Sequence, residues 1–106
     1  MADTLKRLSG PASLTNSAAT VYTVPGATVA VIRDINVANT TGSAATFTLS
    51  IGADAAGKRL FSAVSIPANS TLQRTGSIVL AATEVVQAYS GTNAALTLTL
   101  SGVESA

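Results

Sequence analysis

The side chains in this sequence that could carry out chemistry are few and of limited kinds. Its 106 residues include no histidine and no cysteine. A serine or cysteine nucleophile is normally activated by a neighbouring histidine, so Ser-His and Cys-His catalytic pairs are excluded. The remaining titratable groups are five carboxylates and six bases. We therefore expect a protein that is not an enzyme and has no catalytic residues.

The carboxylates do not form the pattern of a hydrolytic or metal site. A pair for glycoside cleavage would have to come from Asp34, Asp54 and Glu84, and nothing in their spacing favours this. Asp54 stands alone in the segment GADAAG, whereas calcium takes about six or more oxygen ligands, several of them carboxylates. We expect no metal and no cofactor.

The basic residues are better suited to a protein contact than to a nucleic-acid contact. Six bases balanced by five acids give a net charge of +1, which is no electrostatic footprint for nucleic acid. Two short basic pairs remain, and we take them with two flanking leucines as candidate partner-binding residues. They are Leu5, Lys6, Arg7, Leu8, Lys58 and Arg59. The alternative is that the first group is a solvated arm with a leucine anchor and the second a solvated strand end.

The overall composition indicates a small domain that associates with neighbours. Charged residues make up 10% of the chain, against about 25% in an ordinary soluble domain. Low charge with near-zero net charge promotes association, so we expect a homo-oligomer. The alternative is a small monomer kept soluble by its serine and threonine hydroxyls. Only four side chains are aromatic, which predicts a thin, aliphatic core.

Targeting signals are not apparent in the sequence. No apolar run approaches the roughly 18 residues that a membrane span needs. The first residues, MADTLKRLSGP, lack the apolar centre of a signal peptide. We expect neither export by that route nor a membrane contact.

Residues 28–39, TVAVIRDINVAN, form the longest run of strand-forming residues. Alternation with period 2 would place Val29, Val31, Ile35 and Val37 on one face. Arg33 interrupts that row. The strand is therefore either buried on both faces near its start, or carries a bulge at Arg33 and Asp34 that switches its inward face.

The rest of the chain reads as short strands separated by turns, with no helical stripe. We expect strands near residues 19–24, 45–51, 58–66, 70–75, 77–80, 84–90 and 95–101, with a hairpin loop at 39–43, a break at Gly76 and a strand end at Gly102. About eight short strands predict an all-β fold, an antiparallel β-sandwich that is Ig-like or jelly-roll-like. Residues 1–17 show no lasting period and are predicted to be an extended N-terminal arm, with residues 18–106 as the single sandwich domain.

Two of the expected strands, 45–51 and 95–101, alternate large apolar residues with threonine and serine. Each should bury one face and expose an uncharged hydroxyl face. Such a strand invites pairing at a free edge. We expect both strands to be internal to the sheets or covered by a subunit.

Several segments together resemble a family of small β-rich virion proteins of tailed bacteriophages that infect actinobacteria. The likeness is carried by LKRLSGPASLTNSAATVYTVP, IRDINVANTTGSAATFTLSIGADAAGKRLF, SIPANSTL, VLAATEVVQAYSG and LTLTLSGVE. It extends from about Leu5 to Glu104 and rests on strand and turn phrases rather than on catalytic motifs.

The resemblance implies a structural protein of the virion, made in the host cytoplasm. It is either a decoration (minor capsid) protein that binds the major capsid protein on the outer surface of the head, or an accessory tail or fibre protein. For the first role we expect a trimer that docks through the N-terminal arm and one loop edge. A third interpretation, a surface module that binds carbohydrate, is disfavoured by the scarcity of aromatic residues.

Overall fold

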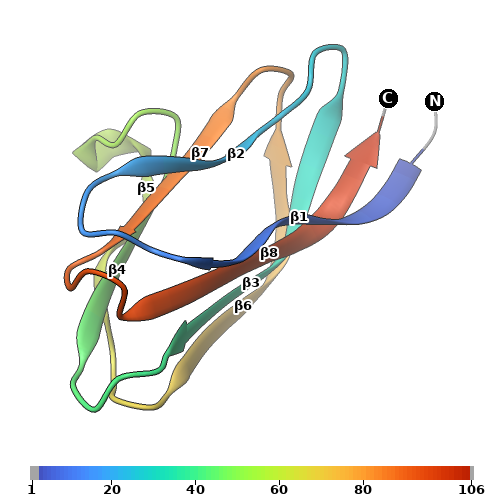
Figure 1. Cartoon of the computed structure of the whole chain (residues 1–106). Coiled ribbons are helices and arrows are strands. Elements are labelled where there is room, and N and C mark those ends of the chain that lie inside the picture. The colour runs from blue at the N-terminus through green and yellow to red at the C-terminus, as the bar shows by residue number, and fades with distance from the viewer. Residues whose placement is uncertain (1–2, 106) are drawn as a thin grey trace.

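Eight antiparallel strands form two facing sheets (Figure 1). The computed structural model describes residues 3–105. The strands are β1 (Asp3–Ser13), β2 (Ala19–Thr23), β3 (Val29–Asn39), β4 (Ala45–Ile51), β5 (Arg59–Ile66), β6 (Thr71–Leu80), β7 (Val85–Ser90) and β8 (Leu96–Ser105), with one short 3-10 turn, η1 (Ala56–Lys58). The first sheet has the order β1-β8-β3-β6 and the second β2-β7-β4-β5. The predicted all-β sandwich is confirmed.

The strand order is that of a jelly roll. Strand β1 pairs with β8, β2 with β7, β3 with β6 and β4 with β5. The chain is thus one long hairpin, folded so that successive pairs lie alternately in the two sheets. Only β4 and β5 are both consecutive and paired. The predicted hairpin loop at residues 39–43 is therefore wrong, because that connection crosses from the first sheet to the second.

A bulge in β3 decides which of its side chains face the core. The register with both neighbours shifts between Ile32 and Asp34. Before the shift Ala30 and Ile32 are buried, and after it Ile35 and Val37 are buried. An extra residue in a strand turns the following side chains to the other face. The predicted bulge is confirmed, and the alternative of burial on both faces is wrong.

Strand β8 continues through Gly102, where the sequence predicts its end. A Cβ atom on Gly102 would lie 1.9 Å from the backbone oxygen of Val31 on β3. This glycine is needed because two backbones approach closely beside the bulge, and not because the strand ends. Likewise Gly76 does not break β6, which runs as one strand from Thr71 to Leu80.

The segment expected to be an arm is an edge strand of the first sheet. Residues 3–13 form β1, and Leu8 and Leu14 belong to the core, with 8% and 3% of their surface exposed. The arm and domain boundary at residue 17 is therefore wrong; residues 1, 2 and 106 lie outside the described part of the chain. The pairing of β1 with β8 has two register shifts. Because each shift changes which side chains face inward, apolar residues do not recur at every second position of this segment.

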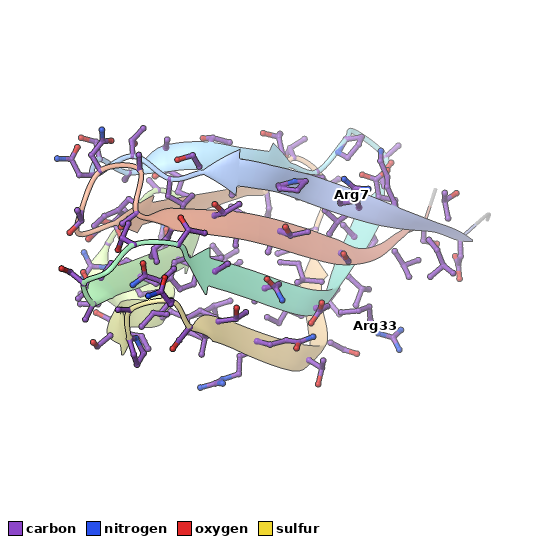
Figure 2. All side chains as sticks on the ribbon, turned by 60° about the horizontal axis from the view of Figure 1, so that its bottom comes forward. Arg7 and Arg33 are labelled. Atoms are coloured by element: carbon purple, nitrogen blue, oxygen red, sulfur yellow. The ribbon has the colours of Figure 1, made fainter. Side chains whose placement is uncertain are left out.

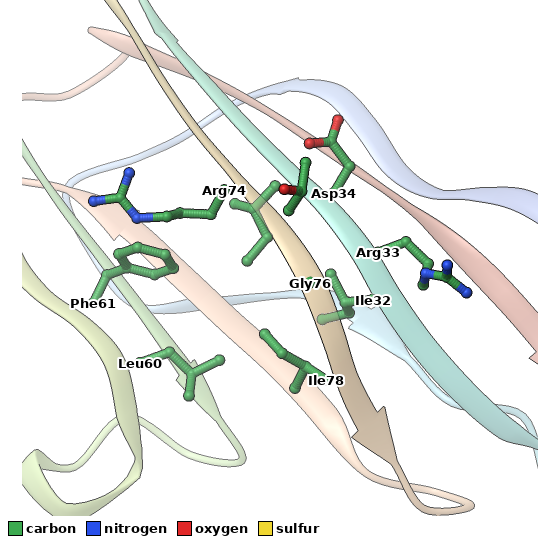
Figure 3. A pocket seen from close by; sticks show the side chains of 10 residues that line it. Ile32, Arg33, Asp34, Leu60, Phe61, Arg74, Gly76 and Ile78 are labelled. Carbon is green, nitrogen blue, oxygen red and sulfur yellow. The ribbon is translucent and has the colours of Figure 1, made fainter.

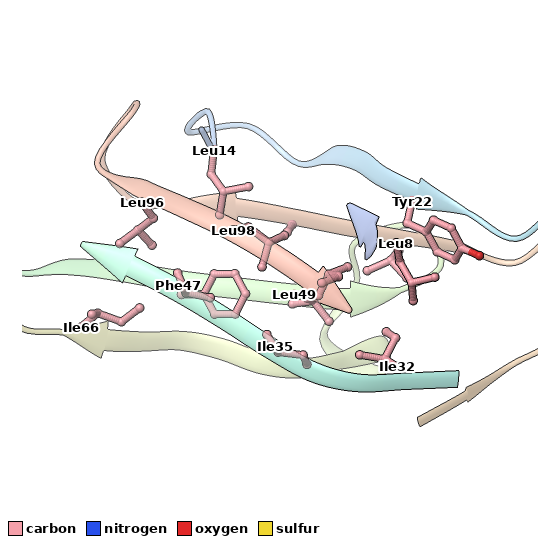
Figure 4. Close-up of a cluster of buried hydrophobic side chains, with 14 of the residues drawn as sticks. Leu8, Leu14, Tyr22, Ile32, Ile35, Phe47, Leu49, Ile66, Leu96 and Leu98 are labelled. Atoms are coloured by element: carbon pink, nitrogen blue, oxygen red, sulfur yellow. The ribbon is translucent and has the colours of Figure 1, made fainter. Parts of the chain in front are cut away.

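The core lies between the sheets and is mostly aliphatic (Figure 4). Phe47 is fully buried, and its ring centroid lies 5.4 Å from that of Phe61. Strand β5 bulges near Ala63, and this turns Phe61 towards the core. Regular alternation from Ile66 and Val64 would instead have placed Leu60 inward, but Leu60 is 45% exposed. The bulge changes the direction of the side chains on either side of it.

Strands β4 and β8, for which the sequence predicts hydroxyl faces, are both internal to their sheets. This is one of the two expected arrangements, the other being cover by a subunit. Strand β4 lies between β7 and β5, and β8 lies between β1 and β3. The hydroxyl face of β4 is not exposed, however, because Thr48 and Ser50 are buried. The Oγ1 atom of Thr48 accepts a hydrogen bond of 3.0 Å from the backbone N–H of Ala63.

Substitution of Gly102 tests the close approach of β3 and β8. Gly102→Ala should lower the free energy of unfolding by about 3 kcal/mol, because backbone must move to admit the methyl group. The matched control is Gly42→Ala, where an added Cβ would have no atom within 4 Å and the change should stay within about 0.5 kcal/mol. Urea unfolding measures both, and equal stability of the two variants would contradict the close contact.

Candidate functional site

The structure does not bring the predicted partner-binding residues together. Residues 5–8 lie on β1, an edge strand of the first sheet. Lys58 and Arg59 lie at the start of β5, an edge strand of the second sheet. Strand β1 contacts β2, whereas β5 lies beside β6 across a groove, so the two groups occupy opposite sides of the sandwich.

Arg59 is held by groups of its own chain. Its Nε and Nη2 atoms donate hydrogen bonds of 2.9 and 3.1 Å to the two carboxylate oxygens of Asp54. Nη2 also lies 3.4 Å from the hydroxyl of Tyr89. The guanidinium lowers the pKa of the Asp54 carboxyl, chiefly through these hydrogen bonds. Arg59 therefore already has a bidentate carboxylate partner within its own chain.

The four predicted residues of β1 point in two directions. Leu8 is buried in the core. Lys6 forms an ion pair of 3.1 Å with Glu104 on β8. Leu5 and Arg7 lie on the outer face of the first sheet, where Leu5 is 87% exposed. Leu5 and Arg7 are thus the two that lie on the outer face, while the Lys6 side chain is 49% exposed and paired with Glu104.

Leu5 is one end of an apolar row that crosses all four strands of the first sheet. It pairs with Val103 on β8, Val103 pairs with Val31 on β3, and Val31 pairs with Val79 on β6. We call these four residues the outer row. Val103 and Val31 are half-buried between their neighbours, and Val79 is 67% exposed. The outer row is therefore a continuous apolar stripe on an exposed sheet face.

The two flanks of the outer row differ in charge. On one side lie Arg7 and, at the bulge, Arg33 (Figure 2), together with the single carboxylate of Asp34, which pairs with Ser101. Within residues 3–105, neither arginine takes part in an ion pair. On the other side lie Asp3 on β1 and Val29 on β3, which are the two cross-strand partners of Ser105 on β8. The outer face of this sheet thus combines an apolar stripe with one basic flank.

An apolar groove opens between the edge strands β5 and β6 (Figure 3). Its volume is about 220 Å³, and apolar side chains from Ile32, Leu60, Phe61 and Ile78 line it. Arg74 lies at its rim. The groove has room for an apolar side chain but no pair of titratable groups arranged for proton transfer.

Glu104 ties together the end of the sandwich beside the outer row. Its carboxylate accepts hydrogen bonds from the Tyr22 hydroxyl of β2 and from the Lys6 ammonium of β1. These two hydrogen bonds, that from Tyr22 foremost, lower the pKa of Glu104. Burial, together with the hydrogen bond to Glu104, raises the pKa of Tyr22. The contact joins the two sheets, because β1 and β8 belong to the first and β2 to the second.

The carboxylates of Asp34, Asp54 and Glu84, the three that could have formed a hydrolytic pair, each have a different hydrogen-bond partner. Asp34 accepts a hydrogen bond from Gln73, and Glu84 accepts one from the backbone of Ala81. Within residues 3–105, no three side chains of histidine, cysteine, aspartate or glutamate are grouped as metal ligands. The described part of the chain also contains no helix with the length and apolarity to cross a membrane.

Comparisons with protein-family models and with curated proteins find no match to this chain. The resemblance to phage virion proteins therefore remains a prediction. The outer face of the first sheet is the candidate surface for a contact with another molecule.

The Glu104 cluster predicts an acid-sensitive fold. As the pH falls, the unfolded chain takes up a proton at Glu104 before the folded protein does, because the folded pKa is lowered. The stabilisation should be complete above about pH 4.5, and it should be lost as the pH falls through the folded pKa. At pH 7, Glu104→Gln should cost about 1 kcal/mol of unfolding free energy, and the difference from wild type should shrink towards pH 3.

A double-mutant cycle checks that the effect comes from the Tyr22 contact. Urea unfolding of Tyr22→Phe, Glu104→Gln and the double variant should show effects that are not additive, because Tyr22→Phe removes the hydrogen bond and Glu104→Gln removes the negative charge of its acceptor. Additive losses, or a difference between Glu104→Gln and wild type that is the same at pH 7 and pH 3, would contradict this account.

Proposed function

We propose that this chain is a non-enzymatic structural protein of a tailed-phage virion, a decoration protein that binds the outer surface of the assembled head. The observation that carries the proposal is the exposed outer row with its basic flank, a surface for contact on a chain whose carboxylates are engaged in structural bonds. The sequence likeness to small virion proteins supports it. The jelly roll is also a frequent architecture of viral capsid domains, although a fold alone does not determine a function.

The proposed action is stabilisation by mass action. A protein that binds the closed shell but not its separated subunits shifts the equilibrium towards the shell. Many copies on one shell bind with avidity even when each contact is weak. A stiff sandwich suits this role, because a preformed surface loses little conformational entropy on binding.

The docking element differs from the arm that the sequence predicts. Residues 3–13 are hydrogen-bonded to β8, and Leu8 fills the core. Removing residues 1–12 would therefore unfold the edge of the first sheet instead of detaching an arm. A test of docking has to keep β1 and alter only exposed positions.

The carbohydrate-binding alternative lacks an aromatic platform. Tyr22 and Phe47 are buried, and Phe61 packs on the core. Tyr89 is half-buried and lies beside Arg59. All four aromatic residues are thus buried or half-buried. An accessory role in the tail draws on the same surface as the head role, and localisation separates the two.

Localisation on the particle tests the proposal. Because the chain has no cysteine, a Ser65→Cys variant carries one thiol, at an exposed position on the second sheet. Gold-labelled protein is added to particles from a phage whose copy of this gene is deleted, and the particles are imaged by cryo-EM. We expect label at regular positions on the head, together with greater resistance of the heads to heat.

Competition supplies the control for that experiment. Heads first saturated with unlabelled protein should take up no gold. Label confined to the tail would replace the head role with the accessory tail role. Absence of label from both head and tail would overturn the proposal altogether.

A further inference from the structure

We infer that the outer face of the first sheet joins two copies of this chain about a two-fold axis that runs along the outer row. This inference goes beyond the proposed function and does not depend on it. It assigns the face to a second copy in the free protein, so a copy that binds the head through this face would first have to leave the dimer. The occupant is identified by complementarity of charge within the face itself. A two-fold interface uses the same surface twice, so the surface must fit its own rotated copy.

Strand β1 meets that requirement. Its outward residues read Asp3, Leu5 and Arg7, a carboxylate and a guanidinium on either side of an apolar residue. Rotation by 180° about the outer row places Leu5 beside Leu5 of the second copy. The same rotation places Arg7 over Asp3 of that copy, and Asp3 over its Arg7. The Asp3 carboxylate would accept from Arg7 in addition to the hydrogen bond of 2.6 Å that it accepts from the Ser105 hydroxyl. Each copy thus supplies both members of a reciprocal pair of ion pairs.

The rest of the face agrees with this axis. The row containing Arg7, Ser101 and Asp34, with Arg33 beside it at the bulge, would lie over the row containing Asp3, Ser105 and Val29 of the second copy. Arg33 would then cover Val29, which is 41% exposed, with the stem of its side chain. The strands of the two facing sheets would be nearly aligned, the usual arrangement of packed sheets.

A two-fold axis along the strands fails on charge. It would gather Arg7 and Arg33 of both copies in one row. That row also holds Asp34, so four guanidiniums would share it with two carboxylates. Like charges brought together at an interface disfavour that pairing. The axis along the outer row is therefore the one that the charges select.

The size of the face predicts weak association. Three side-chain rows on four strands cover roughly 20 by 20 Å, from strand spacings of about 4.8 Å and a rise of about 3.3 Å per residue. Two copies would bury roughly 800 Å² in all, below the 1,200 Å² or so of a stable complex. We expect a monomer–dimer equilibrium of the free protein that is visible at high concentration.

Crosslinking distinguishes the two possible axes. Facing sheets lie about 10 Å apart, beyond the reach of a disulfide, so a short bismaleimide is the suitable reagent. For an axis along the outer row, Leu5→Cys should crosslink to itself and Val79→Cys to itself, and a mixture of the two should give no mixed dimer. A mixed dimer without self-crosslinking would overturn the proposed axis. Ser65→Cys on the other sheet is the control and should remain uncrosslinked.

Charge exchange tests the reciprocal ion pairs. In sedimentation velocity over a concentration series up to about 1 mM, Arg7→Asp should weaken the dimer about tenfold or more, because two carboxylates then face each other twice. The double variant Asp3→Arg with Arg7→Asp should recover dimer strength close to that of wild type. Lys58→Asp changes the net charge equally at a site away from this face and should leave the equilibrium unchanged.

Three outcomes would overturn the inference. One is a monomer at every concentration, and another is a trimer, the oligomer expected from the virion resemblance. The third is an equal effect of Arg7→Asp and Lys58→Asp, or no recovery in the double variant. Thermal unfolding of each variant establishes that the substitutions, all at exposed positions, leave the fold intact.

Discussion

The bulge at Arg33 is the constraint on which the functional surface of this molecule depends. Four aliphatic residues of β3, namely Val29, Val31, Ile35 and Val37, share one parity in the sequence, and a regular strand would place them on the same face. The extra residue divides them, so that Ile35 and Val37 enter the core and Val31 remains outside. The apolar stripe on the outer face exists because the bulge leaves the first half of β3 facing outward.

The same bulge requires an adjustment in the neighbouring strands. Gly102 lies beside it on β8, where the backbone of β3 approaches too closely for a side chain. The register of β6 shifts at the corresponding position. Both neighbours of β3, namely β8 and β6, thus accommodate its extra residue. The side chain of Arg33 at the bulge points outward and supplies part of the basic flank.

The architecture and most strands could be predicted from the sequence because they depend on local patterns. The alternation of Phe47 and Leu49 with threonine and serine predicts β4 to the residue. The failure at β1 has a local cause too, since its register shifts hide the alternation that would have indicated a strand. The burial of Thr48 depends on a bulge in a different strand and could not be predicted from its own segment.

The candidate site was only partly predictable for a different reason. Leu5 and Arg7 were identified from their types, and both lie on the outer face. Their neighbours in the outer row come from β8, β3 and β6, far along the chain, and only the register of four strands aligns them. The sequence also indicated assembly from the hydroxyl faces of two strands. Both strands are internal, so the outer row is the surface that remains for association.

The pairing of β1 with β8 has a consequence for the connectivity of the polypeptide. Asp3 and Ser105 are direct cross-strand partners, so the two ends of the folded hairpin lie together. A short turn could join them into a nearly closed ring of strands, and new ends could then be opened at the exposed segment around Gly57. The order in which the strands are synthesised is thus separable from the order in which they pack, which makes this jelly roll a natural scaffold for circular permutation.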